Sequence, residues 1–452
     1  MRRLLLLVLL LACSSGAKDA PPAVSPAPSA RTTGPEHPDR AHPGSTNAPQ
    51  SFTPAATPRA HASALQPLWT VEVGPTTSET TMLVESKNLY IGTATGISVV
   101  SAKGALLRKL ALPLTLGLAR DGTKLFAATT DGAVVVLSLD GTIHARARLG
   151  AAPTSAPALA DFNADGVVDA VVGDVRGNVT AVDGKSGSVL WQRAIGSASA
   201  GAASLVDLDG DGTDDIVVGS GGGALLGLRG KDGATLFTVA GDSPMRAPPI
   251  IVDVDGDGRQ EIVATWSHAR VAIISRSGQT MWSARVEEDD GTPDLLGAAA
   301  VPIASLHNAV IAVATSGLGA RDGVVLVGER QRAFRSHEGR VTSTPIVTRV
   351  ETEELPAAIV GTDSGAVIAF DALGNRTSLT NVGAPISASL LVSDVNSEGL
   401  LELFVVTANG ALTAFLSPAP APALVPRYRG ASPHNDGRIP AIRIPWRFVE
   451  AK

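Results

Sequence analysis

The stretch LVDLDGDGTDDIVVG, residues 205–219, is the strongest indication of the fold, because similar stretches recur twice at a constant interval. The copies are LADFNADGVVDAVVG at residues 159–173 and IVDVDGDGRQEIVAT at residues 251–265. Each copy places an acidic loop between two short aliphatic runs, which is typical of two strands joined by a turn. Asp161, Asp207 and Asp253 open the three loops and lie 46 residues apart. Such an interval indicates a repeat architecture with one supersecondary unit per copy.

A second element recurs in phase with the loops and joins a glycine to an aromatic residue. Its clearest copies are GSVLW at 187–191, GATLF at 233–237 and GQTMW at 278–282. Each repeat therefore contains four short strands, two flanking the acidic loop and two flanking the glycine turn. Four antiparallel strands in about 46 residues form one blade of a β-propeller. The sequence predicts an all-β fold with a single β-propeller over residues 68–416.

The ring is expected to hold eight four-stranded blades, although the weak first and sixth repeats leave seven open. The segment LWTVEVG at 68–74 matches the fourth-strand segment LWQRAIG at 190–196. We therefore expect the N-terminal strand to complete the last blade and to close the ring, which removes unpaired strand edges. Trp69, Trp191 and Trp282 share one position of the repeat and are expected to pack between blades.

The acidic loops have the composition of a calcium site. Each reads Asp-x-Asp/Asn-x-Asp-Gly-x-x-Asp/Glu. Calcium takes six to eight oxygen ligands, many of them carboxylates. Glycine at the sixth position permits a positive φ that turns the chain back, so that the seventh carbonyl can face the ion. Three such loops predict about three structural calcium ions.

These loops resemble the FG-GAP or VCBS repeats of integrin-type propellers, which bind calcium with this spacing. The resemblance implies ligands from the first, third, fifth, seventh and ninth positions, with a main-chain carbonyl at the seventh. The implied ligands are Asp161, Asn163, Asp165, Val167 and Asp169; Asp207, Asp209, Asp211, Thr213 and Asp215; and Asp253, Asp255, Asp257, Arg259 and Glu261. A fourth loop matches in part, with a longer glutamate at the fifth position, and its metal binding is left open. Its residues are Asp394, Asn396, Glu398 and Glu402.

The glycine–aromatic elements resemble the PQQ-type repeat of quinoprotein propellers. Quinoprotein alcohol dehydrogenases of that kind carry adjacent cysteines beside the quinone. This sequence holds one cysteine, so no PQQ cofactor is expected.

The N-terminus indicates export and lipid anchoring. Two arginines and eight aliphatic residues at positions 4–11 form a signal-peptide pattern that is too short to span a membrane. The sequence LLAC at 10–13 resembles the lipobox of bacterial lipoproteins, which implies a signal peptide at 1–12 and a lipidated Cys13. Residues 14–67 are rich in Pro, Ala, Ser and Thr, so 13–67 is predicted to be a lipidated cysteine with a disordered tether. Residues 417–452 form a Pro-rich tail. Ser14 follows the cysteine, and lipoproteins without aspartate at that position usually go to the outer membrane. Which side of the membrane the propeller faces is left open.

Composition limits the function. The formal charge of −6 opposes nucleic-acid binding, which needs a basic face. The sequence contains no Gly-x-Ser-x-Gly, HExxH or phosphate-loop motif. We therefore expect a non-enzymatic scaffold that is anchored in the membrane by its lipid and binds an envelope protein or glycan. An envelope-assembly factor, similar to the propeller lipoprotein of the outer-membrane β-barrel assembly machinery, is one alternative. A propeller enzyme such as a polysaccharide lyase is another.

Overall fold

The structure is a computed structural model, and the residues that it describes belong to one compact unit, residues 60–452. The described residues are 65–78, 80–113, 115–254, 257–286, 294–302, 309–316, 322–327, 332–348, 357–371, 376–420, 434, 436 and 438. The predicted signal peptide, Cys13 and the tether lie outside this set, as do Asp255 and most of the tail.

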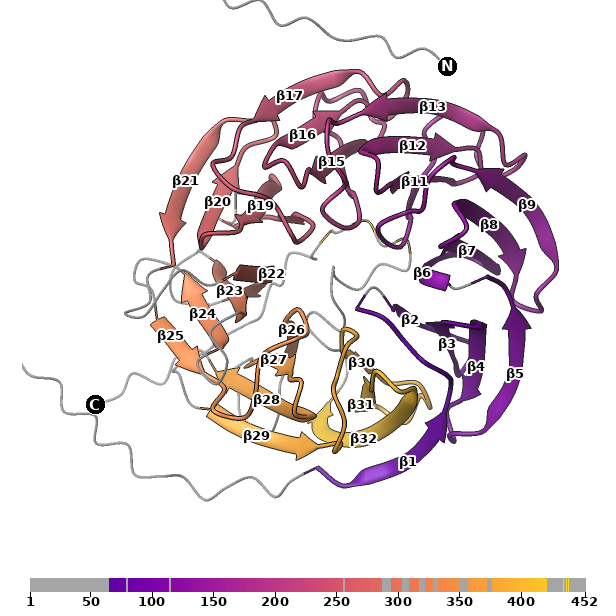
Figure 1. The fold of residues 1–452 in the computed structure, drawn as a ribbon, viewed down its shortest axis with the longest axis vertical. Helices are drawn as coiled ribbons and strands as arrows, with labels where there is room; N and C mark the ends of the chain where they lie inside the picture. The colour runs from indigo at the N-terminus through magenta and orange to yellow at the C-terminus, as the bar shows by residue number, and fades with distance from the viewer. Residues whose placement is uncertain are drawn as a thin grey trace, which may run out of the picture. The chain divides into compact units, whose positions relative to one another are not determined.

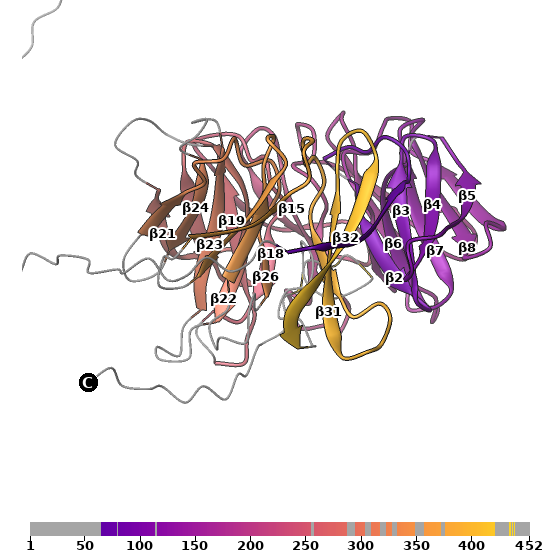
Figure 2. The same ribbon diagram turned by 90° about the horizontal axis from the view of Figure 1, so that it is seen from below.

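The described residues form eight antiparallel sheets of four strands each. Figure 1 shows the sheets arranged in a ring, and Figure 2 shows the ring from its edge. The all-β propeller is confirmed, and eight sheets is the larger of the two predicted ring sizes. None of the described residues forms a helix long and apolar enough to cross a membrane.

Each blade is numbered by its place in the ring, and its four strands are listed below from the inside of the ring outward. Blades 1 and 2 contain β2 (Met82–Glu85), β3 (Asn88–Thr93), β4 (Gly96–Ser101) and β5 (Leu106–Ala111), and then β6 (Thr115–Asp121), β7 (Lys124–Thr129), β8 (Ala133–Ser138) and β9 (Ile143–Arg148). Blades 3, 4 and 5 contain β10 (Ala158–Ala160), β11 (Asp169–Gly173), β12 (Asn178–Val182) and β13 (Val189–Ala194); β14 (Ser204–Val206), β15 (Asp215–Gly219), β16 (Leu225–Leu228) and β17 (Thr235–Val239); and β18 (Ile250–Val252), β19 (Glu261–Trp266), β20 (Arg270–Ile274) and β21 (Thr280–Arg285). Blades 6 and 7 contain β22 (Asp294–Pro302), β23 (Ala309–Ser316), β24 (Gly323–Val327) and β25 (Arg332–Arg335), and then β26 (Ile346–Thr348), β27 (Ala357–Gly361), β28 (Ala366–Asp371) and β29 (Arg376–Asn381).

Blade 8 closes the ring with strands from both ends of the propeller. It contains β30 (Leu391–Ser393), β31 (Leu400–Val406), β32 (Ala411–Pro420) and, as its outermost strand, β1 (Pro67–Glu72). β1 pairs antiparallel with β32, with Thr70 opposite Thr413. The predicted closure by the N-terminal strand is therefore confirmed. β32 runs to Pro420, four residues beyond the predicted end of the propeller, because Pro420 still pairs with Leu400.

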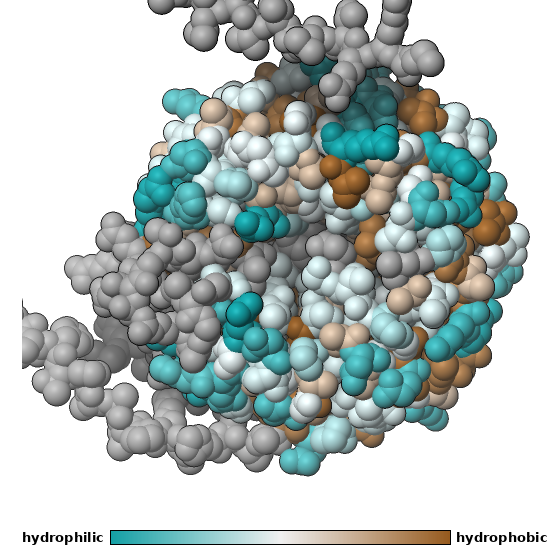
Figure 3. Space-filling model, in the orientation of Figure 1, coloured by the Kyte–Doolittle hydropathy of each residue, from teal (hydrophilic) through white to brown (hydrophobic). Residues whose placement is uncertain are grey.

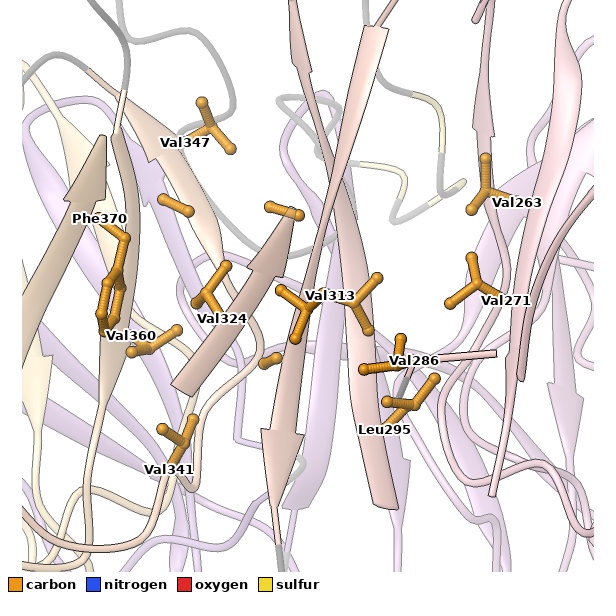
Figure 4. Packing of buried hydrophobic residues seen from close by; sticks show 14 of the residues in the cluster. Val263, Val271, Val286, Leu295, Val313, Val324, Val341, Val347, Val360 and Phe370 are labelled. Atoms are coloured by element: carbon orange, nitrogen blue, oxygen red, sulfur yellow. The ribbon is translucent and has the colours of Figure 1, made fainter. Parts of the chain in front are cut away.

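The core lies between the blades. Second strands such as β11 and β15 are buried along their whole length, because each is covered by a sheet on both faces. Figure 4 shows one such cluster, in which Val263 of blade 5, Val313 of blade 6 and Val360 of blade 7 contribute to the same packing. Neighbouring blades are thus held together by shared aliphatic clusters.

Aromatic residues on the outer strands add a second contact between blades. The Trp191 indole of blade 3 covers Gly233 of blade 4 and donates a 2.7 Å hydrogen bond from Nε1 to the Gly230 carbonyl. Trp69 of blade 8 covers Gly104 of blade 1 in the same way. A Cβ at Gly233 would lie 2.6 Å from the Trp191 ring, so the glycine leaves room for the indole. The predicted packing role is confirmed for these two tryptophans.

Candidate metal centres in the acidic loops

The four acidic loops occupy one equivalent place, the connection between the first and second strands of blades 3, 4, 5 and 8. In the first three loops, the ninth residue is also the first residue of the following strand: Asp169, Asp215 and Glu261. The acidic pattern therefore ends inside the sheet, which fixes one candidate ligand to a rigid element.

An equivalent hydrogen bond recurs in all four loops and folds each loop around its first aspartate. The sixth-position glycine donates its N–H to Oδ2 of that aspartate, at 2.8 Å in blade 3 and 3.1 Å in blade 4. The corresponding distances are 3.0 Å in blade 5 and 2.9 Å in blade 8. These four glycines have φ between 81° and 88°, and a Cβ added to any of them would meet nothing within 4 Å. Backbone conformation, rather than crowding, requires glycine here.

The fifth and seventh positions are linked in the same way in the three matching loops. The seventh-position N–H donates to Oδ1 of the fifth-position aspartate at 2.7 to 2.8 Å. The linked pairs are Val167 with Asp165, Thr213 with Asp211, and Arg259 with Asp257. All three predicted loops therefore share these two hydrogen bonds.

The ninth-position carboxylates are buried and hydrogen-bonded. Asp169 accepts N–H bonds from Phe162 and Gly184, both at 3.0 Å. Asp215 accepts equivalent bonds from Leu208 and Gly230, both at 2.9 Å. Their exposed fractions are 1% and 0%. Each carboxylate thus ties its loop to the turn between the third and fourth strands of the same blade.

Burial disfavours the charge on these groups. Burial raises the pKa of Asp169 to about 6, and the nearby Asp183 carboxylate adds to the rise. Burial also raises the pKa of Asp215 and of Glu402, with repulsion from Asp209 and Asp394 respectively. A cation among these oxygens would favour the charged form.

The blade 4 loop brings three carboxylates together. Oxygens of Asp207, Asp209 and Asp215 lie within 4.8 Å of one another, the one such acidic cluster among the described residues. The blade 3 loop has Asn163 in place of the second carboxylate, and Asp255 of the blade 5 loop lies outside the described residues. The donors of the blade 4 loop are hard oxygens, so this loop fits calcium.

The partial loop of blade 8 keeps the framework but differs in its side chains. Glu402 accepts the Val395 N–H at 2.9 Å, as the ninth position does elsewhere. The Asn396 amide also donates to Glu402, and its Oδ1 accepts the Glu398 N–H at 2.9 Å. The third and ninth positions thus bond to each other in this loop.

A scan against family models gives two overlapping matches, to residues 66–237 and 170–372. Together they cover more than half of the 452 residues. The chain belongs to the family described as outer membrane protein assembly factor BamB. The resemblance to PQQ-type repeats is confirmed by this match.

No curated protein matches the chain. Among solved structures, Sqt1 of Saccharomyces cerevisiae has a TM-score of 0.59 at 13% identity, covering 79% of this chain and 100% of its own. The quinohemoprotein alcohol dehydrogenase ADHIIG of Pseudomonas putida HK5 has a TM-score of 0.56 at 12% identity, with coverage of 80% and 78%. The computationally designed Ika8 protein has a TM-score of 0.55 at 15% identity, with coverage of 78% and 99%. These likenesses show the propeller fold alone.

Membership of the BamB family does not assign a function to the acidic loops, and calcium binding stays a prediction.

The structure adds two residues near the acidic loops that the motif did not include. Asp183, in the turn after β12, accepts a 3.1 Å bond from the Asn163 amide. Arg229, at the equivalent turn of blade 4, approaches Asp209 at 3.4 Å. The two positions lie 46 residues apart, so comparing the repeats in phase could have found them.

Proposed function

We propose that this protein is a calcium-stabilised, non-enzymatic propeller scaffold that acts in the assembly of outer membrane proteins. The observation that carries the proposal is the match to the BamB family model across residues 66–372. Lipidation at Cys13 would hold the ring at the outer membrane by the tether of residues 14–67. This role unites the scaffold and the assembly factor that the sequence left as alternatives.

Calcium would supply positive charge to loops that otherwise concentrate negative charge. The four loops hold 15 of the 43 carboxylates in the sequence. In the three matching loops, the ligands would be side chains of the first, third, fifth and ninth positions with the seventh carbonyl. Asp169 and Asp215 are the first residues of their strands and are held there by hydrogen bonds. In the blade 3 and blade 4 loops, the chain therefore holds one proposed ligand in place before an ion binds.

The outer rim offers surface for a protein partner. Exposed aliphatic residues stand on the outermost strands of four successive blades, from blade 8 to blade 3, and their exposed fractions range from 49% to 54%. They are Leu68, Leu107, Ile143 and Val189. On the face seen in Figure 3, apolar side chains are interspersed with polar ones.

Photo-crosslinking in whole cells tests the proposal. A crosslinking amino acid at Leu107 or Ile143 should capture subunits of the β-barrel assembly machinery, identified by mass spectrometry. Ser283, exposed on the outer strand of blade 5, is the matched control position. Capture of glycan or of unrelated proteins alone would contradict the assembly role. Separately, Cys13→Ala should release the protein from membranes, and continued anchoring would refute the lipid anchor.

A further inference from the structure

Three described residues of the C-terminal tail lie against the inner edges of three successive blades. The His434 carbonyl accepts the Leu159 N–H of β10 at 2.9 Å. The Asp436 carbonyl accepts the Leu205 N–H of β14 at 2.8 Å. Arg438 then forms a parallel bridge with Ile251 of β18. Figure 1 shows these residues in yellow at the inner side of the ring.

The spacing of these contacts follows the repeat. Leu159, Leu205 and Ile251 are equivalent residues that lie 46 apart, and the tail advances by two residues from each to the next. Two residues of extended chain span about 7 Å. The innermost strands of these neighbouring blades approach within 8 Å between Cα atoms, so the two periods agree in space.

Side chains add contacts that depend on residue identity. The Arg438 guanidinium pairs with Asp214 and donates a 3.0 Å bond to the Leu205 carbonyl. His434 Nε2 lies 3.0 Å from Oδ1 of Asp121, in blade 2. Asp436 is 7% exposed, and its carboxylate accepts the Arg438 N–H at 3.0 Å. The tail therefore contacts four blades through both its backbone and its side chains.

We propose that the inner edges of β10, β14 and β18 form a binding site for an extended peptide, which His434, Asp436 and Arg438 of the chain's own tail occupy. An innermost strand presents backbone groups that no neighbouring strand pairs, and an extended segment can satisfy them. Asp214 and Asp121 select a peptide with a cation at the position of Arg438 and an imidazole at the position of His434. We call His434, Asp436 and Arg438 the strap, because together they contact blades 2 to 5. The strap does not depend on the assembly role, and its anchor Asp214 lies in the blade 4 acidic loop next to Asp215.

The strap can be tested in the full chain with a protease site inserted between Val425 and Pro426. Cleavage after folding leaves the C-terminal piece attached by non-covalent contacts alone. The piece should co-elute with the ring on size-exclusion chromatography. Excess synthetic peptide of residues 430–440 should displace it, whereas the same peptide with Arg438→Ala should not. Immediate separation of the piece from the wild-type ring would overturn the proposal.

Variants of the cleavable chain identify the anchoring residue. Arg438→Ala should speed release of the piece about tenfold or more, because a charge-assisted hydrogen bond contributes about 1.5–3 kcal/mol. Asp214→Asn should have a similar effect from the opposite side, which guards against a folding defect peculiar to one variant. Arg148→Ala removes an exposed arginine from outer strand β9 and is the matched control. Equal release from Arg438→Ala, Asp214→Asn and the control would also overturn the proposal.

Discussion

Blades 1 and 2 join their first two strands with two residues, where blades 3, 4 and 5 use eight. In blade 1 the turn is Ser86–Lys87, and in blade 2 it is Gly122–Thr123. Ser86 and Lys87 have φ of 51° and 62°, as a tight hairpin requires. Both kinds of blade form four strands, so a blade does not need the longer loop. The six additional residues bring carboxylates together against their mutual repulsion, and a bound cation would offset that cost.

The largest effect is expected from removing a ninth-position carboxylate. Asp215→Ala leaves the partly buried N–H of Leu208 and the buried N–H of Gly230 without their acceptor. Each loss costs about 1–3 kcal/mol, so the free energy of unfolding should fall by about 2–6 kcal/mol in chemical denaturation. Asp140→Ala, in a turn of blade 2, is the control and should change stability by no more than about 0.5 kcal/mol. Similar losses in both variants would show that the acidic loops are no more important than ordinary turns.

Calcium removal should destabilise the blades that carry long acidic loops and leave the blades with two-residue hairpins unaffected. A site saturated at a hundred times its Kd contributes about 2.7 kcal/mol, so chelation with EGTA should lower the Tm by several degrees. Hydrogen exchange should quicken in residues 161–169 and 207–215. The hairpins at Ser86–Lys87 and Gly122–Thr123 should exchange at unchanged rates. Uniform exchange across all of these segments would remove the distinction between the blades.

In calcium-free protein, the dependence of the unfolding free energy on pH should reflect the titration of the buried Asp169. Its folded pKa of about 6 exceeds its ordinary value of 3.8, so the folded chain binds its proton more tightly than the unfolded chain. Stability should therefore fall as the pH rises from about 4 to 6, by up to about 3 kcal/mol from this group. Asp169→Asn should remove that share of the slope in pH-dependent denaturation. A slope unchanged by the substitution would assign the pH dependence to other groups.

The smallest expected effect concerns the partial loop of blade 8. Glu398→Asp restores the shorter carboxylate of the matching loops at the fifth position. The change should raise the number of bound calcium ions by one, counted by native mass spectrometry, with little change in Tm. Four ions already present in the unsubstituted chain would mean that the longer side chain is tolerated.

The repeat made most of the fold predictable, because its 46-residue period fixes which residues are equivalent. Asp161, Asp207 and Asp253 indicated the loops, and the likeness of 68–74 to 190–196 indicated the closure. Asp183 and Arg229 escaped the motif because they reach the loops from a different turn of the blade. The contacts of His434 and Arg438 were not foreseen, because a segment that advances two residues per blade shows no likeness to the repeat that it contacts. Asp255 lies outside the described residues, so the blade 5 ligand set stays a prediction.

Calcium titration by isothermal calorimetry tests the central claim most directly. The chain should first be stripped with EDTA and exchanged into chelator-free buffer. We predict saturable binding of about three ions, and loss of one ion in an Asp207→Ala/Asp209→Ala double variant that keeps the propeller folded. The absence of saturable calcium binding to the folded, stripped protein would contradict the account.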